Sequence, residues 1–153
     1  TGANDPDSQH RTALGHDYVV MDNEDDQTGE RLSEFHYLFL PMLKNVCQRM
    51  NIKNANVLQG RSFLQFPLNL KDKSVDTPHI DLHRREHLVA LYYVCDSDGD
   101  TIIYNEREQS ETYTIKQKVT PKQGRIVIFD GGLYHTAEQP LNNVRCVVNY
   151  NLG

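Results

Sequence analysis

The sequence has few cysteines and no long apolar run. Its three cysteines, Cys47, Cys95 and Cys146, lie far apart, and an odd, scattered set predicts reduced thiols rather than a disulfide framework. No apolar stretch approaches the roughly eighteen residues that a membrane span requires. The first residues, TGANDPDSQHRTALGHD, lack the basic segment and apolar core of a signal peptide. We therefore expect a cytoplasmic protein without a membrane anchor, and the absence of Met at position 1 predicts further residues upstream.

Positive charge is also scarce. The chain carries 16 Lys and Arg against 21 Asp and Glu, which gives a formal net charge of -5. This balance does not favour general binding to nucleic acids, because Lys and Arg neutralise the phosphates in most nonspecific complexes. Four basic residues close in sequence could still form a local patch: Lys116, Lys118, Lys122 and Arg125. Lysine on a hairpin, however, more often protects the edge of a sheet.

A length of 153 residues predicts one domain. Residues 1–30 are polar and include the acidic run MDNEDDQTGE, so we expect a solvated N-terminal arm with a short strand at YVVM. Residues 31–153 then form the single domain. Between Arg31 and Met50, apolar residues recur at three- and four-residue steps, which predicts an amphipathic helix. Pro41 should kink this helix or shift its start.

From residue 54 onwards the pattern changes to short runs of β-branched and aromatic residues, separated by turn residues. The six runs are NVLQGRSFLQF, HLVALYYV, DTIIYN, TYTIKQKV, GRIVIFD and VRCVVNYNL. No helix-length segment interrupts them. One helix followed by six or more antiparallel strands predicts a mainly β fold, a sandwich or jelly-roll barrel with the helix packed outside.

Three residues have the spacing of a metal site. Side chains two apart in an extended segment point the same way, so His79 and Asp81 can reach one ion from a short piece of backbone. His135 is the best placed third ligand, because Gly131 and Gly132 allow a sharp turn before it. Two imidazoles and one carboxylate on one side of a metal leave the opposite positions open, as in non-haem Fe(II) oxygenases. The sequence therefore predicts a metal site with room for further ligands.

A charged residue opens the last apolar run. Arg145 begins RCVVNYNL, and Arg145, Val147 and Asn149 share one face of the expected strand. A permanently charged, planar guanidinium in apolar surroundings needs a partner, and its geometry suits a bidentate carboxylate. Asn149 faces the same side and either lines the site or caps the strand end. We therefore expect Arg145 to hold a carboxylate.

His79-x-Asp81, LVALYYVCDSDGDT, His135 and Arg145, in this order, resemble the 2-oxoglutarate and Fe(II)-dependent oxygenases, and among them the prolyl-4-hydroxylase-like group. The resemblance covers roughly residues 55 to 152 and implies a double-stranded β-helix, a cupin-like jelly roll. It implies that His79, Asp81 and His135 bind Fe(II). Arg145 and Tyr93 would then bind the distal carboxylate of 2-oxoglutarate. The implied activity is hydroxylation with O2 as co-substrate, with release of succinate and CO2.

Parts of the chain depart from the family pattern. Only Gly99 is present where the family commonly has a Gly-Gly-x-Thr turn, and relatives of the collagen-modifying type often carry Lys where this chain has Arg145. Without the resemblance, Tyr93 would be taken for a core tyrosine. By resemblance, a prolyl residue in a peptide or protein is the first candidate substrate and a small metabolite the second. A nucleobase is third, because such enzymes usually need basic surface and stacking aromatics.

A zinc-protease motif overlaps the same region. His83-Arg84-Arg85-Glu86-His87 spells HxxEH, which binds zinc when both histidines lie on one face of a helix. His87 instead leads into LVALYYV, whose composition is typical of a strand, so we interpret the motif as solvated surface. Arg84 and Arg85 follow the expected ligands closely and could meet an acidic or phosphate-bearing substrate at the mouth of the site.

Two other classes of protein fit these residues. A non-oxygenase jelly roll of the cupin kind could hold zinc with His79, Asp81 and His135, because zinc also accepts imidazole and carboxylate ligands. Such a protein would bind metal without consuming 2-oxoglutarate. A purely structural or interaction domain would instead need a protein carboxylate as the partner of Arg145.

Overall fold

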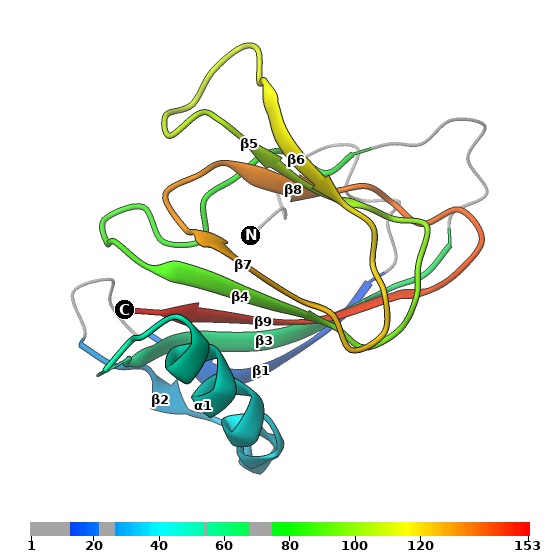
Figure 1. The fold of residues 1–153 in the computed structure, drawn as a ribbon. Coiled ribbons are helices and arrows are strands. Elements are labelled where there is room, and N and C mark those ends of the chain that lie inside the picture. The colour runs from blue at the N-terminus through cyan, green and yellow to red at the C-terminus, as the bar shows by residue number, and fades with distance from the viewer. Residues whose placement is uncertain (1–12, 22–26, 54, 68–74) are drawn as a thin grey trace.

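The structure is a computed structural model that describes residues 13–21, 27–53, 55–67 and 75–153. Two antiparallel sheets face each other, and a helix lies outside the larger one (Figure 1). The elements in chain order are β1 (Ala13–Val20), β2 (Glu30–Arg31), a 3-10 helix (Glu34–Leu38), α1 (Leu40–Arg49), β3 (Val57–Gln65), β4 (Leu88–Tyr93), β5 (Thr101–Tyr104), β6 (Ile115–Val119), β7 (Ile126–Asp130), β8 (His135–Ala137) and β9 (Arg145–Leu152). The larger sheet has the strand order β2-β1-β3-β9-β4-β7, and the smaller has the order β6-β5-β8.

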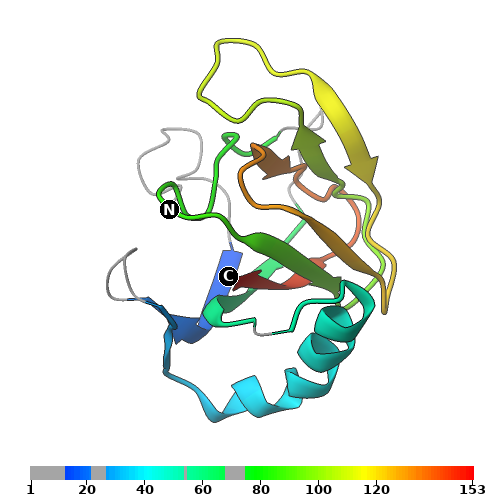
Figure 2. The ribbon, with the colours of Figure 1, turned by 60° about the vertical axis from the view of Figure 1, so that its left-hand side comes forward.

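The larger sheet has two faces with different surroundings. Its outer face carries the main apolar core, in which Val148 and Tyr150 of β9 pack with Leu43 and Val46 of α1. Its inner face is turned toward the smaller sheet, on the side away from the helix (Figure 2). Because side chains alternate along a strand, every second residue of β3, β4 and β9 points to this inner face.

The predicted amphipathic helix forms in two parts. Ser33 begins a 3-10 helix by accepting a hydrogen bond from the amide of Phe35, and α1 starts after it, at Leu40. Pro41 is the second residue of α1. Proline is tolerated in the first turn, where its missing N–H has no intrahelical acceptor. The prediction that Pro41 shifts the helix start is therefore confirmed.

A glycine allows the outer face to hold a large aromatic ring. Gly60 of β3 pairs with Tyr150 of β9, and a Cβ atom at Gly60 would lie 2.2 Å from the Tyr150 ring. The Tyr150 hydroxyl lies 2.9 Å from Nδ1 of His36, in the 3-10 helix. This contact joins the helical segment to the centre of the sheet, directly behind the inner face.

The six strands predicted after residue 54 are present as β3, β4, β5, β6, β7 and β9. A further strand, β8, was not predicted, because it has only three residues and follows directly on the Gly131-Gly132 turn. The strand expected at YVVM is longer than predicted and begins at Ala13. It pairs with β3 from Ala13 to Val19, so most of the described part of the expected arm belongs to the sheet. The division into an arm over residues 1–30 and a domain over 31–153 stays a prediction.

The sequence predicted reduced cysteines and no membrane span. Cys47, Cys95 and Cys146 are free and half-buried in the structure. Among the described residues, no helix has the length and apolar character needed to cross a membrane.

Candidate metal centre and carboxylate site

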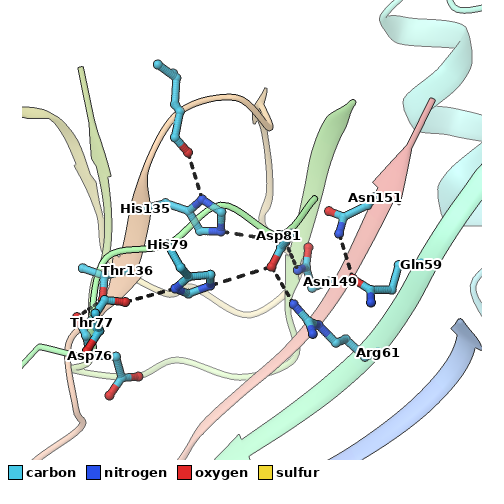
Figure 3. A network of polar contacts seen from close by, with 11 residues as sticks. Gln59, Arg61, Asp76, Thr77, His79, Asp81, His135, Thr136, Asn149 and Asn151 are labelled. Atoms are coloured by element: carbon cyan, nitrogen blue, oxygen red, sulfur yellow. Dashed lines mark hydrogen bonds and ion pairs between the residues drawn. The ribbon is translucent and has the colours of Figure 1, made fainter. Parts of the chain in front are cut away.

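The three predicted ligands come together beside the inner face. The candidate ligand atoms of His79, Asp81 and His135 all lie within 4.8 Å of one another. Nε2 of His79 is 3.7 Å from Oδ1 of Asp81, and Nε2 of His135 is 3.8 Å from Oδ2 of the same carboxylate (Figure 3). The backbones of His79 and His135 exchange two hydrogen bonds of 3.0 Å. The extended segment that carries His79 and Asp81 is thereby fixed next to β8.

Both imidazoles are oriented by backbone carbonyls. Nδ1 of His79 lies 3.1 Å from the carbonyl oxygen of Thr77, and Nδ1 of His135 lies 3.1 Å from that of Leu133. A carbonyl only accepts hydrogen bonds, so each Nδ1 carries the hydrogen and each Nε2 presents its lone pair toward Asp81. Burial lowers the pKa of His135 to about 4, although the Asp81 charge opposes this effect. Both rings thus have the tautomer that a metal ligand needs, and His135 stays neutral near pH 7.

Two residues from the sheet hold the Asp81 carboxylate. Nη2 of Arg61 donates to Oδ1 at 2.5 Å, and Nδ2 of Asn149 donates to Oδ2 at 2.9 Å. Burial alone would raise the pKa of Asp81, but the charge of Arg61 and the neighbouring His135 and His79 outweigh burial and hold this pKa well below its usual range. The side chain of Asp81 is therefore ionised and held in one orientation before any metal binds.

The donor set fits a divalent transition metal. Two neutral imidazole nitrogens and one carboxylate oxygen are the protein ligands of non-haem Fe(II) oxygenases, and they also suit zinc. Arg61 and Asn149 occupy the carboxylate from the sheet side, which favours coordination through one oxygen. We call Arg61, His79, Asp81, His135 and Asn149 the metal end of the inner face.

The predicted carboxylate-binding residue lies farther along the same face. Arg145 is buried, and its guanidinium donates to the carbonyl of Gly99 at 3.0 Å, to Oε1 of Gln65 at 2.8 Å and to Oγ1 of Thr101 at 2.8 Å. Within the described ranges, no carboxylate forms an ion pair with Arg145. Its positive charge is therefore surrounded by neutral acceptors.

Tyr93 reaches the same place from β4. Its hydroxyl donates to Oγ1 of Thr101 at 2.8 Å, so Tyr93 and Arg145 share one acceptor. Burial raises the pKa of Tyr93, which keeps the phenol neutral. The structure thus brings together the two residues predicted to bind a carboxylate, and we call Gln65, Tyr93, Thr101 and Arg145 the carboxylate end of the inner face.

Sequence reasoning missed three residues of these two ends. Arg61 and Gln65 lie on β3 and Thr101 opens β5, and none of them was assigned a role. A signal was present in VLQGRSFLQ, where Gln59, Arg61 and Gln65 alternate with residues of the outer face. Polar residues at alternate positions of a strand that pairs on both sides indicate a polar face inside the fold.

The HxxEH motif does not lie on a helix. Residues 83–85 form a turn, and His87 precedes β4. The buried His87 ring fills the space beside Gly131, where a Cβ atom would lie 2.1 Å from Nε2. Arg85 donates to the carbonyl of Gln27 at 3.5 Å. The role proposed for Arg84 and Arg85 at the mouth of the site stays a prediction.

The predicted basic patch is partly neutralised. Lys118 pairs with Glu138 at 2.5 Å, and Lys122 pairs with Asp96 at 2.9 Å. Arg125 donates to the carbonyl of Thr120 at 2.6 Å. Lys118, Lys122 and Arg125 line a groove between β6 and β7, whereas Lys116 is not part of its lining. The acidic partners of the two lysines reduce the positive charge of this groove. The groove therefore gives no support to nucleic-acid binding.

Comparisons with known proteins give matches in structure only. No family model and no curated protein matches the sequence. A 2OG-Fe(II) oxygenase family oxidoreductase from Burkholderia pseudomallei has a TM-score of 0.68 at 10% identity, over 92% of this chain and 66% of its own. The viral collagen prolyl hydroxylase of Paramecium Bursaria Chlorella virus-1 has a TM-score of 0.62 at 12% identity, over 93% and 78%. A non-heme, alpha-ketoglutarate-dependent carbocyclase from nogalamycin biosynthesis has a TM-score of 0.61 at 15% identity, over 95% and 69%.

Identities of 10% to 15% establish the fold, while activity has to be argued from the site. The two facing sheets, the outer helix and the position of the metal end all agree with the fold predicted from the sequence. The chain therefore has the double-stranded β-helix fold of the 2OG-Fe(II) oxygenases.

Proposed function

We propose that this protein is a 2-oxoglutarate- and Fe(II)-dependent dioxygenase that hydroxylates an organic substrate and releases succinate and CO2. One observation carries the proposal. A buried arginine with no carboxylate partner among the described residues lies on the inner face of the larger sheet, and the same face meets two imidazoles and a carboxylate arranged as metal ligands. A metal-binding protein without a co-substrate would have no use for the charge of Arg145 at this place.

The metal end would hold the iron. His79, Asp81 and His135 would bind Fe(II) through one atom each, while Thr77 and Leu133 keep the imidazoles oriented by accepting from Nδ1. The bound metal would supply the activation of O2, which side chains alone do not provide. The protein contributes the orientation of the ligands and their protonation states.

The carboxylate end would hold the distal carboxylate of 2-oxoglutarate. Arg145 supplies the charge, Thr101 fixes the guanidinium, and Tyr93 adds a hydroxyl beside it. Asn149 and Arg145 are four residues apart on β9, roughly 13 Å along a strand, so the co-substrate would lie along this strand with one carboxylate at each end. Apolar residues between the two ends, Val147 and Leu91 among them, exclude water from the reacting region.

A prolyl residue of a peptide or protein is the first candidate substrate. The sequence resembles the prolyl-4-hydroxylase-like group, and a viral collagen prolyl hydroxylase is among the structural neighbours. A small molecule is the second candidate, because a carbocyclase from nogalamycin biosynthesis is an equally similar neighbour. The two candidates share the proposed cofactor chemistry and differ only in what the rest of the site must accommodate.

The deciding experiment separates the oxygenase from a zinc-binding jelly roll. Fe(II) and then 2-oxoglutarate are added to metal-free protein under anaerobic conditions, and the visible metal-to-ligand charge-transfer band is recorded. We expect a band that needs both additions and is lost in His79→Ala. Tight zinc binding with no band in the wild-type protein would contradict the proposal and favour the non-oxygenase alternative.

A further inference from the structure

A single glutamine links the positive charge of the carboxylate end to an acidic residue. Gln65 is the last residue of β3 and pairs with Arg145 of β9. Its Oε1 accepts from Nη1 of Arg145 at 2.8 Å, and its Nε2 donates to Oδ2 of Asp76 at 3.3 Å. A guanidinium only donates and a carboxylate only accepts, so these two partners fix which way the amide points. Gln65 is buried, and the link is part of the interior.

The glutamine keeps two opposite charges apart. A buried guanidinium is costly unless it is compensated, and the nearest compensation that the contacts show for Arg145 is Asp76, one residue removed. A direct ion pair would neutralise the guanidinium and compete with a carboxylate ligand. With a neutral amide between them, Asp76 stabilises Arg145 at a distance, and no carboxylate of the described residues is seen in contact with the guanidinium.

Asp76 is itself firmly placed. Its Oδ1 accepts from Nε2 of Gln139 at 2.8 Å, and its amide donates to the carbonyl of Ala137 at 2.9 Å. Asp76 also lies three residues before His79, and its own carbonyl accepts from the Thr136 hydroxyl (Figure 3). The link from Arg145 through Gln65 therefore ends on the segment that carries two of the candidate metal ligands, His79 and Asp81.

We propose that Gln65 is a positioning residue that sets the affinity of Arg145 for a dicarboxylic co-substrate, by orienting the guanidinium while leaving its charge uncompensated at close range. This inference rests on the proposed function and adds a residue to it. The inference predicts that a change in the charge of residue 65 affects binding more than a change in its shape. A carboxylate placed at position 65 would contact Arg145 where the amide oxygen does now and would act as an internal competitor.

The test compares substitutions that change the same charge at different places. Gln65→Glu is isosteric, and we expect it to weaken 2-oxoglutarate binding about 30-fold or more, because one charge-assisted contact is lost to an internal partner. The matched control is Gln139→Glu, which also places a carboxylate against Asp76 but has no contact with Arg145 among those observed. We expect this control to change the affinity by less than about 3-fold, because it leaves the three observed contacts of Arg145 in place.

A second variant keeps the test valid if Gln65→Glu alone does not fold. Combining Gln65→Glu with Asp76→Asn keeps the net charge of the wild-type protein and removes the repulsion between residues 65 and 76. Only the position of the carboxylate changes, so the loss of affinity should persist. Gln65→Met, which removes the link without adding a charge, should lose affinity by only about 5-fold, since Gly99 and Thr101 still orient Arg145.

Affinity is measured by anaerobic calorimetric titration of 2-oxoglutarate into the Fe(II)-loaded protein, with Fe(II) affinity and the melting temperature measured in parallel. The inference predicts that the loss follows the charge on residue 65 and does not follow the melting temperature. Affinities that follow the melting temperature, or a Gln65→Glu protein that binds like the wild type, would overturn it and leave the proposed function intact. Failure of the wild-type protein to bind 2-oxoglutarate would overturn both.

Discussion

At the carboxylate end of the inner face, Arg145 donates to three acceptors, and Gln65 and Tyr93 also have hydrogen-bond partners. The metal end and its surroundings differ. In the described part of the chain, four buried side-chain atoms lack a hydrogen-bond partner: Nε of Arg61, Oδ1 of Asn149, Oδ1 of Asn151 and Nε2 of His87. Arg61 and Asn149 both bind Asp81, Asn151 is two residues farther along β9, and the His87 ring packs beside Gly131 in the turn that leads to His135.

The contrast shows at which end of the inner face the chain supplies hydrogen-bond partners for its own buried polar atoms. An unpaired buried polar atom costs roughly 1–3 kcal/mol, so a fold seldom keeps several in one place without a function or a partner from outside the chain. The carboxylate end has its polar atoms paired and should be rigid. The metal end combines a fixed carboxylate with unpaired neighbours, as expected of a region that ligands and substrate complete.

The largest effect on the metal end should come from changing Asp81, the carboxylate that both histidines face. Asp81→Asn retains an oxygen that accepts from Arg61, and it removes the negative charge that would hold a metal. We expect Fe(II) affinity to fall about 100-fold or more and turnover to be lost. The measurement is bound iron by absorption spectroscopy, with Asp130→Asn as the control. Asp130 pairs with the exposed Arg107, and an asparagine there keeps an oxygen that accepts from the Gly132 amide. An Asp81→Asn enzyme that retained its iron would refute the proposed ligand set.

The next largest effect should come from Arg145, and it should change 2-oxoglutarate binding without changing metal binding. Arg145→Ala removes the charge of the carboxylate end and takes the guanidinium donor from Gln65, while Thr101 still accepts from Tyr93. The 2-oxoglutarate concentration needed for half-maximal turnover should rise about 100-fold, because two charge-assisted hydrogen bonds contribute roughly 3 kcal/mol. Fe(II) affinity should stay close to that of the wild type. An unchanged 2-oxoglutarate requirement would mean that another residue binds the carboxylate.

A smaller effect is expected from the partner of Asp81. Arg61→Met removes the ion pair with Asp81 and leaves a buried carboxylate without its charge partner, which should cost about 3 kcal/mol of stability in the metal-free protein. A bound metal compensates the same carboxylate. Addition of Mn(II), which replaces Fe(II) without air oxidation, should therefore raise the melting temperature of this variant more than that of the wild type. The exposed pair of Arg107 provides the control, since Arg107→Met should leave the melting temperature close to that of the wild type.

The smallest effect should come from Tyr93. Tyr93→Phe removes one hydroxyl, which donates to Thr101, and keeps the buried ring. We expect 2-oxoglutarate to bind no more than about 5-fold more weakly, the effect of one neutral hydrogen bond, with unchanged iron affinity. Calorimetric titration of 2-oxoglutarate into Tyr93→Phe and Arg145→Ala would compare the loss of affinity in the two variants. An effect as large as that of Arg145→Ala would assign Tyr93 a direct and dominant contact.

Much of the fold could be predicted because its signals are local. Alternating apolar residues gave six of the strands, and Pro41 gave the start of α1. The grouping of His79, Asp81 and His135 was also predictable, since two ligands share a short segment and the third follows a glycine turn. In each case the evidence lies within a few residues of the feature.

The contacts of the two ends could not be predicted, because strand pairing determines them. Arg61 meets Asp81 across 20 residues of sequence, and Gln65 meets Arg145 across 80. Nothing near Gln65 in sequence indicates that β9 is its neighbour. The same holds for Gly60, whose close approach to Tyr150 depends on the register of β3 against β9.

The three candidate ligands differ in how far each is exposed. The side chain of His79 is 44% exposed, whereas those of His135 and Asp81 are 9% and 1% exposed. A metal bound by such a set exchanges in steps, and the ligand that releases first is the one that water can replace. Exchange would therefore begin at His79, so this residue would govern how fast a chelator strips the metal, while the two buried ligands would govern how tightly it is held.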